Sequence, residues 1–106
     1  MARWLQQRGV AAFVLKYRLQ EKPSKARCRA TSTWTRPANY GIADGFQALK
    51  VVRRHAAQWG IAPGRLGFMG LSAGGMLVSS ALLQQDASAR PGFAVFIYGA
   101  PFGAVP

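Results

Sequence analysis

The stretch GFMGLSAGG, residues 67–75, decides how the rest of this sequence is interpreted. Its centre, GLSAG, has the pattern G-x-S-x-G, with Ser72 between Gly70 and Gly74 and a short apolar run in front. Between a strand and a helix, this pattern forms a very sharp turn that forces the serine into a strained backbone conformation. Side chains at either flanking position would collide with the neighbouring strand or helix. The stretch therefore predicts a nucleophile elbow, with the Ser72 hydroxyl at the carboxyl edge of a parallel sheet.

The motif alone leaves two other interpretations open. In one, Ser72 only caps the helix that follows; in the other, the turn binds a phosphate. The stretch lacks the G-x-G-x-x-G order of a dinucleotide loop and the lysine of a P-loop. No acidic residue follows about twenty positions later at a strand end, where a ribose would need one. We therefore favour the nucleophile, with the N–H of Ala73 at the helix N-terminus as an oxyanion donor.

The segments around the turn alternate between strand and helix patterns. Residues 10–17, VAAFVLKY, form a near-continuous apolar run, typical of a strand buried on both faces. Together the segments predict a three-layer α/β arrangement with parallel strands and right-handed crossovers. The expected elements are a helix tail at 2–8 ended by Gly9, strands at 10–17, 66–69 and 93–98, and helices at 43–59 and 73–85.

Helical spacing of apolar residues is clearest over residues 43–59. Asp44 has the position of an N-cap, with Gln47 three residues later as in a capping box. Lysine and arginine gather toward the C-terminal half, where the helix dipole favours cations. Trp59 and Phe93 are expected in the core.

Composition indicates one small globular domain. The 106 residues are 50% hydrophobic and 16% charged, with a formal net charge of +11. The densest basic cluster, KPSKARCR at residues 22–29, contains a proline and lacks helical periodicity. We interpret it as a solvated loop, within a basic insert at about residues 18–42, and expect no nucleic-acid partner. Cys28, the single cysteine, excludes an internal disulfide framework.

Targeting signals are weak. No apolar run has the length of a membrane span, and the first residues resemble a signal peptide only faintly. A cytoplasmic location is therefore the default expectation.

Three segments together resemble the α/β-hydrolase superfamily: GVAAFVLKYRL, then DGFQALKVVRRHAAQWGIAPGRLGFMGLSAGG, then RPGFAVFIYG. The resemblance is to the esterase/lipase branch that includes acetylxylan-esterase-like and feruloyl-esterase-like enzymes. It implies a partial α/β-hydrolase sheet, Ser72 as nucleophile and Ala73 as one oxyanion donor. It implies no metal or organic cofactor, and a small-molecule or carbohydrate ester as substrate.

The same resemblance implies an HGG-type loop upstream of the elbow and an aspartate, then a histidine, downstream. None of these motifs lies in the 106 residues, so we expect a fragment or truncated relative of such an enzyme. Within the chain, His55 is the only histidine. Its place near the end of a crossover helix puts it roughly 10 Å from Ser72 along the sheet and about another 10 Å between layers. A general base needs hydrogen-bond reach, so His55 is not expected to serve.

The three acidic residues offer no substitute. Asp86 is expected in a solvated loop at the opposite edge of the sheet, Asp44 is expected as a cap, and Glu21 lies on a loop that we leave unassigned.

These features lead to one main functional expectation and two alternatives. We expect a serine-dependent carboxylic ester hydrolase that is inactive as this chain alone. The first alternative is a degenerate hydrolase fragment that acts as a basic interaction protein. The second is a chain completed by a complementary chain or by an oligomer. Trp34 and Tyr40 are candidates to line an acyl or aryl pocket, if the insert covers the site.

Overall fold

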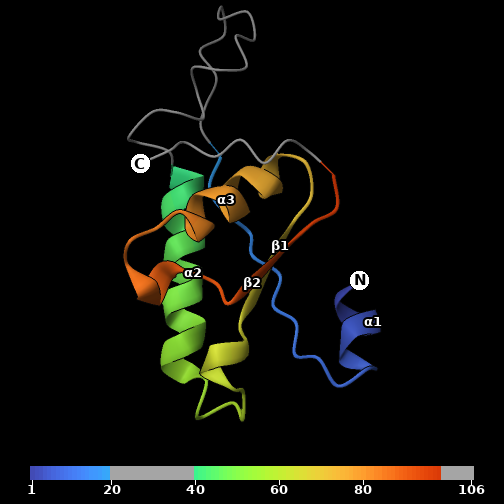
Figure 1. Ribbon diagram of the computed structural model, residues 1–106. Helices are drawn as coiled ribbons and strands as arrows, with labels where there is room; N and C mark the ends of the chain where they lie inside the picture. Colours follow the sequence, from blue (N-terminus) through green and yellow to red (C-terminus); the bar gives the residue numbers. More distant parts are fainter. Residues whose placement is uncertain (20–39, 99–106) are drawn as a thin grey trace, which may run out of the picture.

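The computed structural model describes residues 1–19 and 40–98 (Figure 1). The expected insert therefore lies largely outside the described residues, together with Glu21, Cys28 and Trp34. In chain order the elements are the helices α1 (Ala2–Gln6) and α2 (Tyr40–His55), the 3₁₀ turn η1 (Pro63–Arg65), strand β1 (Gly67–Gly70), helix α3 (Ala73–Leu82), the 3₁₀ turn η2 (Ala87–Ala89) and strand β2 (Phe93–Phe96).

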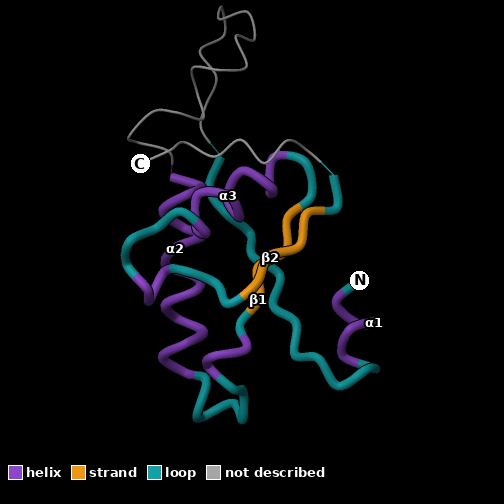
Figure 2. The backbone as a smooth tube through the Cα atoms, in the orientation of Figure 1, coloured by secondary structure: helices purple, strands orange, loops and turns teal. Residues whose placement is uncertain are grey.

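Strands β1 and β2 form a parallel pair with helix α3 as the crossover between them (Figure 2). The register aligns Gly67 with Phe93 and Gly70 with Phe96. Because parallel neighbours need such a connection, this β-α-β unit places the ends of both strands at one edge of the sheet. The two strands and the helix lie within a few residues of the positions that the sequence predicts.

Helix α2 is shifted from its predicted bounds of 43–59. It begins at Tyr40 and ends at His55, and the chain then turns through Gly60, whose φ is +67°. The predicted N-cap role of Asp44 is therefore wrong, because Asp44 lies inside the helix. Its carboxylate instead accepts hydrogen bonds from Arg18, 26 positions earlier in the sequence. The ion pair with Arg18 therefore takes the place of the helix cap that the local sequence pattern predicts.

The segment 10–17 corrects another expectation, since it joins no strand among the described residues. Phe13 and Val14 are 53% and 84% exposed, where the pattern predicted burial on both faces. A strand is stabilised by ladder neighbours, and the described sheet offers this segment none. It is fastened by side chains instead: the Phe13 ring stacks on Trp59 with centroids 5.4 Å apart, and Arg18 binds Asp44.

The core lies where α2, α3 and η2 meet. Gly45 of α2 faces this core, and a Cβ there would be in ordinary contact with the Phe68 ring at 3.4 Å and with Leu77 at 3.7 Å. Trp59 and Phe93 were expected in the core but are 45% and 55% exposed. Phe93 belongs to a two-stranded sheet whose outer surfaces are uncovered, whereas Trp59 lies in the turn after α2, where its ring stacks on Phe13 and His55. The buried apolar residues are Leu49, Ala56, Leu77, Val78, Ala81 and Ala89.

The loop after α3 is fixed to α2 by two basic side chains. The Arg53 guanidinium donates to the carbonyl oxygens of Ala87, Ser88 and Arg90. One turn earlier, Lys50 pairs with Asp86 at 2.8 Å. These contacts hold the loop that leads into β2 against α2.

Candidate active site at the strand–helix turn

Ser72 has the strained backbone that its motif predicts. Its φ and ψ are 51° and −116°, and among the described residues it is the only non-glycine residue with a positive φ. Such a conformation costs about 1–3 kcal/mol and persists only where the surrounding structure enforces it. The side chain is exposed and makes no capping hydrogen bond to α3. The structure thus excludes the interpretation in which Ser72 is simply a helix cap.

The two glycines of the motif have different environments. A Cβ at Gly70 would lie 2.3 Å from the Gly74 carbonyl oxygen and 2.6 Å from the Gly75 nitrogen. Any side chain at position 70 would therefore force the backbone at the start of α3 to move. A Cβ at Gly74 would meet no described atom within 4 Å, and the predicted collision at this position is therefore wrong. At Gly75 a Cβ would lie 3.5 Å from the Phe96 ring, which is ordinary contact. Gly70 is the residue that the sharp turn requires.

Hydrogen bonds hold the turn on both sides. The N–H groups of Gly74 and Gly75 donate to the carbonyls of Leu71 and Ser72, each at 2.9 Å. The Ser72 N–H donates across to the Tyr98 carbonyl at 2.7 Å. The Ala73 N–H has no acceptor among the described residues. This free donor lies next to the Ser72 hydroxyl at the start of α3, where the helix dipole favours negative charge.

His55 lies at the other end of the fold. Helix α2 runs from the edge where β1 ends toward the edge where β1 begins, and His55 is its last residue (Figure 1). The Nδ1–H of His55 donates to the Val51 carbonyl at 2.8 Å, and the ring stacks on Trp59 with centroids 4.9 Å apart. These contacts give His55 a structural position at the helix end, in line with the topological argument from the sequence.

The two described carboxylates are both paired with basic groups. Hydrogen bonds from the Arg18 side chain and backbone N–H hold the pKa of Asp44 below its usual value. Lys50, with the hydroxyl and N–H of Ser88, lowers the pKa of Asp86. Asp86 lies in the exposed loop after α3, as expected. Neither carboxylate is hydrogen-bonded to a histidine, so the described residues contain no acid–histidine pair.

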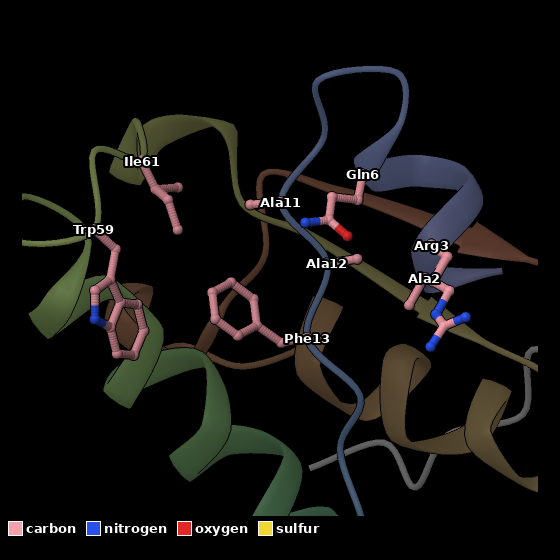
Figure 3. A pocket seen from close by; sticks show the side chains of 8 residues that line it. All are labelled: Ala2, Arg3, Gln6, Ala11, Ala12, Phe13, Trp59 and Ile61. Carbon is pink, nitrogen blue, oxygen red and sulfur yellow. The ribbon is translucent and has the colours of Figure 1, made fainter.

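The described surface has an open hollow of about 460 Å³, away from Ser72 (Figure 3). It lies between α1, the segment that follows it, and the turn after α2. Its lining includes Arg3 and Gln6 on one wall and Phe13, Trp59 and Ile61 on the other. Tyr40 is not part of this lining. It lies at the start of α2, where the Arg18 guanidinium is 4.8 Å from the centre of its ring.

Neither a metal-binding cluster nor a membrane-spanning helix occurs in the described part of the chain. Residues 1–19 and 40–98 hold no group of three or more histidine, cysteine or acidic residues that could bind a metal ion. They also include no helix with the length and apolar character to cross a bilayer.

Sequence reasoning missed two contacts between residues far apart in the chain. The bond from Ser72 to Tyr98 joins positions 26 residues apart, as does the pair formed by Arg18 and Asp44. No local pattern marks either bond. The apolar segment that ends at Tyr98 is recognisable as a strand, but its role as a neighbour of the elbow depends on the parallel register.

Comparison with known proteins agrees with this architecture. The family described as alpha/beta hydrolase fold matches residues 35–105, so the chain belongs to this family. The observed parallel β-α-β unit is therefore part of an α/β-hydrolase sheet, as the sequence predicts.

Two known proteins are similar to this chain over most of its length. An acetylxylan esterase of Xylanibacter ruminicola is 36% identical over 95 residues, which cover 90% of this chain and 17% of the relative. The crystal structure of an acetyl ester-xyloside bifunctional hydrolase from Caldicellulosiruptor lactoaceticus matches with a TM-score of 0.63 and 26% identity. That match covers 90% of this chain and 34% of the solved one. The chain thus spans a minor part of the length of both proteins.

Proposed function

We propose that this chain is the nucleophile-bearing part of a serine-dependent carboxylic ester hydrolase. The observation that carries the proposal is the conformation of Ser72, which has a positive φ and an exposed hydroxyl at a strand–helix turn. Similarity to an acetylxylan esterase supports an acetylated carbohydrate as the substrate class.

The chemistry assigned to the site is acyl transfer. The Ser72 oxygen attacks the ester carbonyl carbon, and the carbonyl oxygen becomes an oxyanion that the Ala73 N–H stabilises. The tetrahedral intermediate collapses with loss of the alcohol, which takes up a proton, and leaves an acyl-serine. Water then hydrolyses the acyl-serine to release the carboxylic acid and regenerate the hydroxyl.

Activation of the serine is the step that this chain lacks. A serine hydroxyl is a weak nucleophile at neutral pH unless a base removes its proton. His55, the only histidine, is bound to Val51 and Trp59 at the far end of α2. We therefore propose that these 106 residues alone have little ester hydrolase activity, and that a base from outside them would have to activate Ser72.

Hydrolysis of p-nitrophenyl acetate across a pH series tests this assignment. We expect a weak rate that Ser72→Ala removes and His55→Ala leaves unchanged. The Ser72-dependent part should rise steadily with pH, because no histidine base of pKa about 6.5 titrates in it. A fast rate with a plateau near neutral pH would contradict the missing base. A rate unaffected by Ser72→Ala would contradict the role of Ser72.

The basic character of the surface favours a second candidate function, a non-catalytic interaction protein. The net charge is +11, and Asp44 and Asp86 are already paired with Arg18 and Lys50. Such a surface attracts polyanions with an affinity that falls as salt increases. Salt-sensitive binding of DNA or RNA, combined with no Ser72-dependent hydrolysis, would favour this alternative.

A further inference from the structure

The bonds between β1 and β2 continue beyond the ends of both strands and reach the elbow. The Ile97 N–H donates to the Gly70 carbonyl at 3.2 Å, immediately before the turn. The Tyr98 carbonyl then accepts the Ser72 N–H at 2.7 Å, within the turn itself. The residues that follow β2 therefore hold the elbow from the side, one bond on each side of Leu71.

We propose that Tyr98 is a positioning residue for Ser72, and that it acts through its backbone carbonyl. The inference rests on the proposed function, because Tyr98 matters for catalysis only if Ser72 is the nucleophile. The hydrogen bond between the two residues can be tested without any catalytic activity. The carbonyl fixes the N–H of the one described non-glycine residue that has a positive φ. A conformation of this kind persists only when the surrounding structure enforces it, and the bond to Tyr98 comes from the residues that follow β2.

The same bond decides which N–H is free to stabilise an oxyanion. The Ser72 N–H is occupied by Tyr98, so it has no role as a donor to substrate. The Ala73 N–H, which has no described acceptor, is left as the donor at the turn. Tyr98 thus holds the nucleophile in place and leaves the adjacent donor free.

The exposed Tyr98 ring is not required for this role. The side chain is 63% exposed, and the group that contacts Ser72 is the main-chain oxygen. The proposal therefore predicts opposite outcomes for changes to the side chain and to the carbonyl. This contrast separates a positioning role from a general effect on packing.

Amide hydrogen exchange of the 106-residue chain tests the proposal. We expect the Ser72 amide to exchange at least about tenfold more slowly than the Ala73 amide, because only the former is hydrogen-bonded. An ester in place of the amide between Tyr98 and Gly99 weakens the Tyr98 carbonyl as an acceptor. It should accelerate exchange at Ser72 several-fold and leave the Leu77 amide in α3 protected, which shows that the fold persists.

Two controls complete the design. Tyr98→Ala keeps the carbonyl and should leave exchange at Ser72 unchanged, and an ester after Gln85 in the exposed loop should do the same. Equal exchange rates at Ser72 and Ala73, or an ester after Tyr98 without effect, would overturn the proposal. Ser72→Ala keeps the N–H and should keep its protection while it removes hydrolysis. Hydrolysis that does not depend on Ser72 would therefore refute its role as nucleophile without affecting the positioning role of Tyr98. An unprotected Ser72 amide would refute the positioning role without affecting the role of Ser72 as nucleophile.

Discussion

At the scale of single residues, the two glycines of the elbow should respond differently to the same substitution. A Cβ at Gly70 would lie 2.3 Å from a backbone oxygen, whereas a Cβ at Gly74 meets no described atom within 4 Å. Gly70→Ala should therefore lower the free energy of unfolding by about 1–3 kcal/mol or more. Gly74→Ala should be neutral or stabilising by up to about 1 kcal/mol, because alanine restricts the unfolded chain. Urea denaturation of both variants measures the difference, and equal losses would contradict the turn geometry.

Two neighbouring serines of α3 form a second matched pair. The Ser79 hydroxyl donates to the Gly75 carbonyl at 3.0 Å, whereas the buried Ser80 hydroxyl has no partner among the described residues. An unpaired buried hydroxyl costs about 1–3 kcal/mol, so Ser80→Ala should raise the free energy of unfolding by about 1 kcal/mol. Ser79→Ala should instead lower it by about 0.5–1 kcal/mol. Thermal denaturation of the two variants decides this, and a larger loss for Ser80→Ala would show that its hydroxyl is bonded.

At the scale of elements, the pair formed by Arg18 and Asp44 fastens the N-terminal segment to α2. The pKa of Asp44 is lowered in the folded state, first by the hydrogen bonds from the Arg18 side chain. Stabilisation by a carboxylate of this kind is present above its unfolded pKa of about 3.9 and is lost as pH falls through the folded value. Asp44→Asn should therefore lower the melting temperature at pH 6, and the gap to the natural chain should close below about pH 4. A gap that stays constant with pH would contradict an ionic contribution.

The helices and strands also show which parts of the fold a sequence pattern can predict. The β-α-β unit was predictable because glycine, serine and helix signals agree within residues 67–82, and a second apolar strand pattern follows at residues 93–98. Asp44 was misassigned because a local capping pattern carries no information about Arg18, whose side chain arrives from another part of the chain. Residues 10–17 have the composition of a buried strand, yet the described sheet provides no neighbour for them. The apolar pattern of a segment shows which environment would suit it. Whether the segment is buried depends on which other elements pack against it.

At the scale of the whole molecule, the strained turn and the groups that would activate it are separated. Ser72 is held at one edge of the sheet by Gly70, by the start of α3 and by the Tyr98 carbonyl. His55 is the last residue of α2, at the end far from the turn, and both described carboxylates are paired with cations. The strained turn at Ser72 was predictable from its motif. That His55 lies out of reach of Ser72 was predictable from the direction of a crossover helix together with the rise per residue of helix and strand.

The most direct test of the central claim is the site and rate of labelling by a fluorophosphonate, mapped by mass spectrometry. We expect slow modification that is concentrated at Ser72 and absent from the Ser72→Ala variant, because the hydroxyl is exposed beside a free N–H but has no base. His55→Ala should label at the same rate as the natural chain. Labelling spread evenly over the serines would contradict the elbow, and fast labelling that depends on His55 would contradict the separation of nucleophile and base.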